Sequence, residues 1–264
     1  MSSAATVPLG ILLRDWRRRR RLSQLDLALE AGVSARHLSF LETGRSRPSR
    51  EMVLHLSEQL DVPLRDRNRL LLAAGFAPAF EERPIDAPEM APVREALEKI
   101  LTGHEPYPAL VVDRWWNLQA ANASVQLFTQ HLPAHLLEPP VNVLRASLHP
   151  EGMAPRILNY GEWRAHLVDR LKRQVALTGD GRLAELLEEI ADYPGETGET
   201  HGPGGEIAVP LRFDAGDREL TFFSTIATFG TAVDITLAEL AIEAFFPADD
   251  ATAHYLTGVS IPLA

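Results

Sequence analysis

Apolar residues recur at helical spacing around a glycine turn early in the chain. Leu25, Leu27, Ala28 and Ala31 fall on one face of a predicted helix, because residues three and four positions apart share a face. After Gly32, Leu38 and Leu41 again repeat at helical spacing. The pattern predicts two consecutive helices joined by a tight turn, within residues 23–47.

The residues of this turn suit two helices that pack at an angle. Gly32 adopts a positive φ at little cost, and the Ser34 hydroxyl can accept a hydrogen bond from a free N–H group of the second helix. Ser23 and Asp26 are spaced as a capping box for the first helix. The layout is typical of a helix-turn-helix that reads DNA, and the alternative is an ordinary helical hairpin.

The second helix leaves a polar, outward-facing surface. Arginines follow it at Arg45 and Arg47, and residues 17–21 form a run of five more. Such a run can be a solvated face, but its place beside the turn favours contact with phosphates. The positions expected to point outward are Ala35, Arg36, Ser39 and Phe40.

Charge divides the chain into unlike parts. Residues 1–75 hold thirteen arginines and no lysine against eight acidic residues, a balance of +5. Since the whole chain carries −10, the remainder carries −15. The total alone would not indicate a nucleic-acid partner, whereas the asymmetry does.

Beyond residue 75 the pattern changes from helical to mixed. A linker rich in proline and acidic residues spans 75–92, and Val93–Leu101 is expected to be a helix connecting two domains. Leu110–Asp113 and Asn117–Ala121 read as a hairpin, followed by predicted helices at Ala123–Gln130, Pro155–Tyr160, Trp163–Thr178 and Arg182–Ala191. After a loop at Pro194–Gly205, strands are predicted at Glu206–Phe213 and Glu219–Phe229, then an amphipathic helix at Leu237–Phe245 and a short helical turn at Ala251–Leu256. The order predicts an α+β domain, one antiparallel sheet with helices on one face.

Catalytic patterns are missing from the sequence. There is no cysteine, Ser224 lacks a nucleophile-elbow motif, and Gly202–Gly205 lacks the lysine of a phosphate loop. His131 and His135 have a metal-ligand spacing, but Pro133 interrupts any helix that would align them. We therefore expect no enzyme, no cofactor and no metal.

Large apolar side chains instead suggest a pocket in the second domain. We take Arg145 and Arg164 as candidates to meet a carboxylate head group, because guanidinium binds that group with two donors. The alternative for either is a structural ion pair. The candidate ligand-binding residues are Trp116, Phe128, Arg145, Trp163, Arg164, Phe222 and Ile226.

The first region resembles the N-terminal domain of phage-repressor or Cro-type (XRE) helix-turn-helix regulators. The residues that carry the resemblance are Ser23-Gln24, Leu27-Ala28, Gly32-Val33-Ser34, Leu41-Glu42-Thr43-Gly44 and Pro48. It implies an all-α module of five helices, at about Leu9–Arg20, Ser23–Ala31, Ser34–Thr43, Arg50–Leu60 and Pro63–Ala74. It also implies that Gln24 contacts DNA, that Ala35, Arg36 and Phe40 read base edges, and that Arg17 pairs with Glu42 to hold two helices together. With the flanking polar residues, the candidate DNA-binding set is Gln24, Ser34, Ala35, Arg36, Ser39, Phe40, Arg45 and Arg47.

Nearly the whole chain resembles the MmyB-like transcription regulators. The residues that carry this resemblance are 60–75, Pro108–Asn117, Asn122, Asn142–Arg145 and Trp163-Arg164. It implies a PAS-like domain whose curved antiparallel sheet and overlying helices enclose an apolar pocket for a fatty-acid-like molecule.

Together these features predict a multi-domain regulator of transcription. We expect a DNA-binding domain at 1–75, a linker and connecting helix at 76–106, and a PAS-like ligand-binding and dimerisation domain at 107–264. The expected partners are double-stranded DNA, a fatty-acid-like small molecule and a second copy of the chain. No stretch reaches the roughly 18 apolar residues of a membrane span, so we expect a cytoplasmic protein. Two alternatives stay open: a lipid-binding or catalytic domain tethered to a DNA-binding module, and a helix-turn-helix that docks to another protein.

Overall fold

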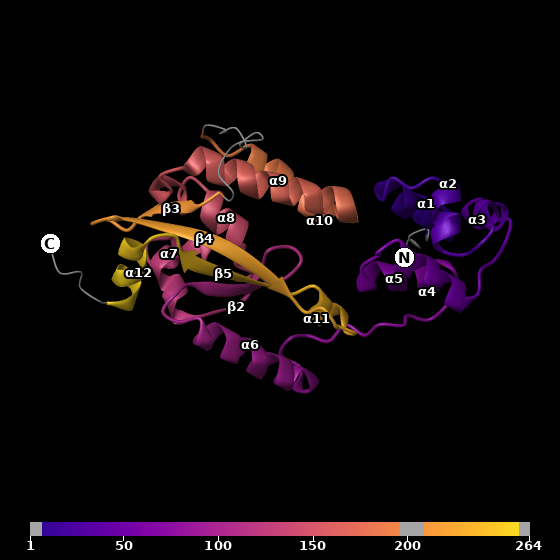
Figure 1. The fold of residues 1–264 in the computed structure, drawn as a ribbon, viewed down its shortest axis with the longest axis horizontal. Coiled ribbons are helices and arrows are strands. Elements are labelled where there is room, and N and C mark those ends of the chain that lie inside the picture. Colours follow the sequence, from indigo (N-terminus) through magenta and orange to yellow (C-terminus); the bar gives the residue numbers. More distant parts are fainter. Residues whose placement is uncertain (1–6, 196–208, 259–264) are drawn as a thin grey trace. The chain divides into compact units, whose positions relative to one another are not determined.

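A computed structural model describes residues 7–195 and 209–258 (Figure 1). Tertiary contacts divide them into two compact units. The N-terminal unit comprises residues 7–83 with 176–178 and 231–238, and the C-terminal unit comprises the other described residues. Each unit has its own cluster of buried apolar side chains, so each has a separate core.

The N-terminal unit contains the five helices implied by the first resemblance. They are α1 (Leu9–Arg19), α2 (Gln24–Glu30), α3 (Ala35–Glu42), α4 (Arg50–Gln59) and α5 (Leu64–Ala73). The predicted capping box is present, since Ser23 Oγ accepts from the Asp26 N–H and the Asp26 side chain accepts from the Ser23 N–H. Close packing of α1 on α3 requires Gly10, because a Cβ there would lie 2.4 Å from the Glu42 carbonyl oxygen.

The C-terminal unit is built on a five-stranded antiparallel sheet in the order β2-β1-β5-β4-β3. Its strands are β1 (Ala109–Val112), β2 (Leu118–Ala121), β3 (Leu211–Asp214), β4 (Glu219–Thr228) and β5 (Ala241–Pro247). This confirms the predicted α+β class and the early hairpin. The first part of the predicted strand Glu206–Phe213, and most of the loop before it, lie outside the described residues.

Helices lie on both sides of this sheet, so the expectation of helices on one face only is wrong. Figure 1 shows α8, α9 and α10 on one side and α6 on the other, where α6 contacts β1. The described α-helices of this unit are α6 (Ala91–Gly103), α7 (Gln126–Thr129), α8 (Val143–Leu148), α9 (Tyr160–Thr178), α10 (Gly181–Ala191) and α12 (Asp250–Thr257), with residues 176–178 at the end of α9 counted in the N-terminal unit. The helix α8 was not predicted.

Two predicted helices of the second region are wrong. Residues 155–160 hold the end of a 3-10 turn at Ala154–Arg156 and only the first residue of α9, because Ile157 between them forms a bridge to Phe213 of β3. Residues 237–245 hold the end of a short helix, α11 (Ile235–Ala238), and then most of β5. The β5 strand pairs with β1 on one side and β4 on the other, so it is the central strand of the sheet.

Candidate functional site

The helix α3 is fixed in the N-terminal unit by its inner face. Leu38 and Leu41 are buried at 0% and 2% exposure, while the turn before the helix has the predicted positive φ at Gly32. Ser34 caps the helix as predicted, because its Oγ accepts a hydrogen bond of 3.1 Å from the His37 N–H. The opposite face of α3 is therefore held in a defined orientation.

That opposite face brings most of the candidate DNA-binding residues together. Arg36 is exposed, and its guanidinium lies 5.3 Å from the centre of the half-buried Phe40 ring on the same helix face. Ser34, Arg45 and Arg47 are exposed around it. Ala35 and Ser39 are half-buried. The face thus offers one guanidinium, one aromatic ring and two hydroxyl groups, beside two further cations.

Gln24 lies on the inner side of this arrangement. Its Nε2 donates a hydrogen bond of 2.8 Å to Glu42 Oε2, and the side chain is half-buried. Glu42 in turn accepts from Arg17, which confirms the helix-joining pair implied by the resemblance. One amide hydrogen of Gln24 is thus committed to α3.

Some arginines of the run at residues 17–21 bind other groups of the N-terminal unit. Arg17 is buried against Glu42, and Arg20 donates to the carbonyl oxygens of Leu60 and Asp61 at 2.8 and 2.7 Å. Arg18 and Arg21 are exposed. The run is therefore a mixture of structural and solvent-facing guanidinium groups.

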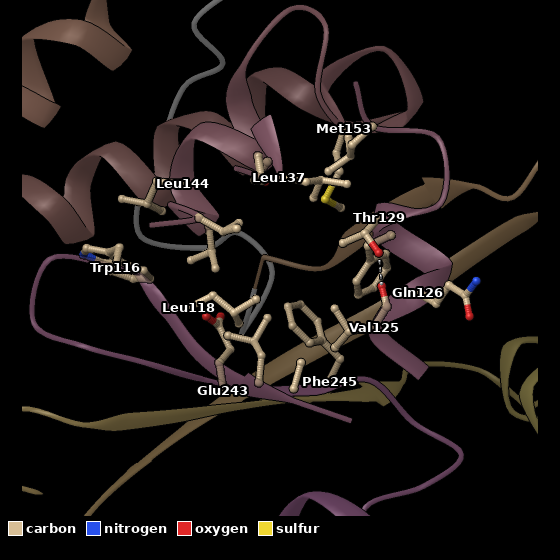
Figure 2. A pocket seen from close by; sticks show the side chains of 18 of the residues that line it. Trp116, Leu118, Val125, Gln126, Thr129, Leu137, Leu144, Met153, Glu243 and Phe245 are labelled. Carbon is tan, nitrogen blue, oxygen red and sulfur yellow. Dashed lines mark hydrogen bonds between the residues drawn. The ribbon is translucent and has the colours of Figure 1, made fainter. Parts of the chain in front are cut away.

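A cavity of about 410 Å³ lies between the sheet and the helices of the C-terminal unit. Figure 2 shows Phe245 reaching into it from the sheet, with Leu144, Leu137 and Met153 on the opposite side. Most of its lining side chains are apolar, and the volume falls in the range of about 300–1,000 Å³ usual for small-molecule pockets. The site can enclose an apolar molecule.

The β1–β2 turn places Trp116 in the wall of this cavity. Asp113 Oδ1 accepts from the N–H groups of Trp115 and Asn117, and Trp116 adopts a φ of 68°, which is strained for a bulky residue. The Trp116 indole N–H donates to Gln174 Oε1 at 2.9 Å. The turn and α9 therefore hold the ring in place from both ends.

Three of the seven candidate ligand-binding residues line the cavity: Trp116, Phe128 and Trp163. Phe222 does not, because it is fully buried in the core, where its ring meets that of Phe128 at 5.5 Å. Ile226 does not line it either, since it lies on β4 with 43% of its surface exposed.

The two candidate arginines also lie outside the lining, and both bind groups of the protein. Arg145 forms a two-point ion pair with Glu189, at 2.8 and 2.7 Å, which is the structural alternative left open for it. Arg164 is buried and donates from Nη2 to the carbonyl oxygens of Ile190, Ala191 and Tyr193, at the end of α10. Its role there is to satisfy carbonyl groups that a helix end leaves unpaired.

Sequence reasoning missed Glu243, the charged group of the cavity. This residue lies on β5, and Figure 2 shows its carboxylate turned toward Leu118. Burial raises the pKa of Glu243 above its ordinary value. The charge of Arg170 and a hydrogen bond from Ser224 lower the pKa, but by less. In a strand, Glu243 and Phe245 face the same side because they lie two positions apart. This signal was missed because the segment was predicted to be a helix.

One group of potential metal ligands occurs in the described ranges, at His135, His149 and Glu151, whose ligand atoms lie within 4.8 Å of one another. His149 Nδ1 already accepts a hydrogen bond from the Glu151 N–H, and His135 pairs with the Glu151 carboxylate at 3.5 Å. These contacts account for the group without an ion.

Comparison with known proteins matches both units. Residues 93–257 match the MmyB-like transcription regulator ligand binding domain, and residues 13–66 match the helix-turn-helix family. The chain is also similar to RghRB, an uncharacterized HTH-type transcriptional regulator of Bacillus subtilis (strain 168). The two are 33% identical over 114 residues, which cover 42% of this chain and 80% of RghRB. Among the described helices, none combines the length and apolar character needed to cross a bilayer.

Proposed function

This chain belongs to the MmyB-like transcription regulators, and from that premise we propose that α3 reads a specific DNA sequence while the cavity takes an apolar effector. The matched families make it a DNA-binding transcription regulator with a ligand-binding domain, rather than an enzyme. The observation that carries the DNA-binding part is the exposed guanidinium of Arg36 on a helix whose other face is fully buried.

On this proposal, α3 lies in the major groove. Arg36 donates two hydrogen bonds to a guanine edge, and Phe40 contacts a thymine methyl group. Arg45 and Arg47 contact phosphates, and the Ser34 end of α3 presents free N–H groups to the backbone. Ala35 and Ser39 complete the DNA-binding face, and Gln24 contacts DNA with the part of its amide that is not bound to Glu42. We assign this role to residues 1–75.

The effector we propose for residues 107–264 has a fatty-acid-like alkyl chain. Trp116, Phe128 and Trp163 supply aromatic surface to the cavity, and its aliphatic lining suits methylene groups. Burial of such a chain is favourable by about 0.8 kcal/mol for each CH₂ removed from water. Binding of this effector would control DNA binding by changing the population of protein conformations that are able to bind DNA.

We also propose that the protein acts as a homodimer in the cytoplasm. Helix-turn-helix dimers place two recognition helices in successive major grooves about 34 Å apart, so the geometry of the pair controls affinity. An effector that changes that geometry would alter DNA binding without touching DNA.

Selection of duplexes from a random pool by the full-length protein tests the DNA-binding part. We expect one enriched motif, a footprint over it, and an affinity whose logarithm falls steeply with the logarithm of salt concentration. A pool without enrichment, or binding that does not respond to salt, would favour the alternative in which the helix-turn-helix docks to a protein.

A further inference from the structure

Glu243 is the only ionisable side chain among the described residues that line the cavity. It stands at the centre of the sheet, paired in register with Leu110 of β1 and Ile226 of β4. Its side chain is only 7% exposed. The apolar cavity therefore contains one strong hydrogen-bond acceptor in its floor, and no cation is found in its described lining.

The charge of Glu243 already has a partner behind it. Arg170 Nη1 lies 3.6 Å from Glu243 Oε1, and the Arg170 guanidinium rests on the Trp116 ring at 4.2 Å from its centre. The distance of 3.6 Å is too long for a hydrogen bond, and the Ser224 side chain donates one hydrogen bond to the carboxylate, so further acceptor positions of the carboxylate remain. Carboxylate and guanidinium together are neutral.

This arrangement discriminates between head groups. A ligand carboxylate beside Glu243 would place two like charges at one buried site, which is unfavourable. A ligand ammonium would add one positive charge to a pair that is already balanced, and burial of an unbalanced charge is costly. A hydroxyl adds no charge and donates a hydrogen bond to the carboxylate. The guanidinium groups of Arg145 and Arg164, which would suit an acid, are bound elsewhere.

We propose that the effector cavity binds an alkyl chain that ends in a neutral hydrogen-bond donor, an alcohol rather than a fatty acid, with Glu243 as the acceptor. This inference rests on the proposed function of the cavity and specifies its ligand class. Trp116 and the aliphatic lining hold the chain, and Glu243 selects the head group.

Titration calorimetry with the full-length protein at neutral pH tests the proposal with three probes of equal chain length: decanol, decanoate and decylamine. We expect decanol to bind at least about tenfold more tightly than either charged probe, a difference of about 1.4 kcal/mol. This comparison uses the unchanged protein, so it does not depend on whether a variant folds.

A substitution then assigns the preference to one residue. In Glu243→Gln the acceptor oxygen stays, the negative charge is lost, and Arg170 becomes available to an acid. We expect the gap between decanol and decanoate to shrink to within about threefold, mainly through tighter decanoate binding. Glu185→Gln makes the same chemical change at an exposed position on α10 and should keep the wild-type gap.

Three results would overturn the inference. Decanoate binding as tightly as decanol would mean that Glu243 accepts an acid, as a protonated carboxyl can. Tightest binding of decylamine would mean that the site selects a cation. Failure of all three probes to bind would overturn the apolar-effector proposal together with this one, while the DNA selection described above would still stand separately.

Discussion

Arg17 and Glu42 form a buried two-point ion pair that joins α1 to α3. Arg17 donates from Nε to Glu42 Oε1 at 2.6 Å and from Nη2 to Oε2 at 2.9 Å. Gln24 on α2 donates to the same carboxylate at 2.8 Å. Three helices therefore meet at one carboxylate whose side chain is fully buried, and this junction sets the position of the helix proposed to read DNA.

Replacement of Glu42 by glutamine should destabilise the N-terminal unit strongly. Removal of one partner leaves the Arg17 guanidinium buried without its counter-charge, which typically costs about 3–5 kcal/mol. Hydrogen exchange of peptides from α1 and α3 in increasing urea measures the loss. Glu58→Gln, an exposed position on α4, is the matched control, and equal stability of the two variants would contradict a structural role for the pair.

The same junction predicts an acid-sensitive N-terminal unit. Burial raises the pKa of Glu42, but hydrogen bonds from Arg17 and Gln24 and the charges of Arg17 and Arg14 lower it more, so the pKa lies below its ordinary value of 4.5. The unfolded chain then binds a proton at higher pH than the folded one. The stabilisation is therefore complete above pH 4.5 and is lost as pH falls through the lowered folded pKa.

Urea midpoints of the N-terminal unit between about pH 3 and 6 measure this dependence. The wild-type midpoint should fall more steeply below pH 4.5 than that of Glu42→Gln, which has no proton to bind at this position. Parallel curves for the two proteins would show that other carboxyl groups govern the acid response.

Replacement of Arg36 by alanine should weaken binding to the selected DNA by about 1–3 kcal/mol and relax the preference at one base pair. The reason is the loss of a two-point contact to a guanine, which carries sequence information. Fluorescence anisotropy with the selected duplex and its single-base variants measures both effects. Lys99→Ala removes one exposed cation from α6 in the other unit. If it weakens binding as much as Arg36→Ala, then net charge rather than α3 determines affinity.

Replacement of Arg164 by methionine should destabilise the C-terminal unit by about 1–3 kcal/mol. Methionine fills much of the same space but cannot donate to the carbonyl oxygens of Ile190, Ala191 and Tyr193, so all three hydrogen bonds of Arg164 are lost. Thermal unfolding followed by near-ultraviolet circular dichroism measures the change. Arg182→Met, at an exposed position near the start of α10, should have a smaller effect because its contact is with the Trp115 ring face.

The N-terminal unit was predictable because its decisive signals are local. The glycine turn, the Ser34 cap and the Ser23–Asp26 capping box each need only a few neighbouring residues, and all three occur as expected. Local signals of this kind fix both the helix and the side that faces outward. They do not reveal side-chain partners such as Leu60 and Asp61 for Arg20, which come together only in the folded unit.

The segment that became β5 shows why the rest was harder to predict. Residues 237–245 are rich in leucine, alanine and glutamate, which favour helices when considered alone. Pairing with β1 and β4 on both sides outweighs that weak preference. Once the segment is a strand, Glu243 and Phe245 face the same side and line the cavity. Because this segment was predicted to be a helix, Glu243 was not recognised as a residue of the cavity.

The place of β5 in the sheet also constrains the order of assembly. Hairpins β1–β2 and β3–β4 can each form from neighbouring segments, but both need β5 before they can join. During synthesis from the N-terminus, β5 emerges after the other four strands. Until then, the edges of β1 and β4 that pair with β5 have no partner strand. Contacts between such distant segments form slowly and leave strand edges exposed meanwhile. Substitutions that weaken β5 should therefore lower the yield of native protein through aggregation on the ribosome, before they alter the finished fold.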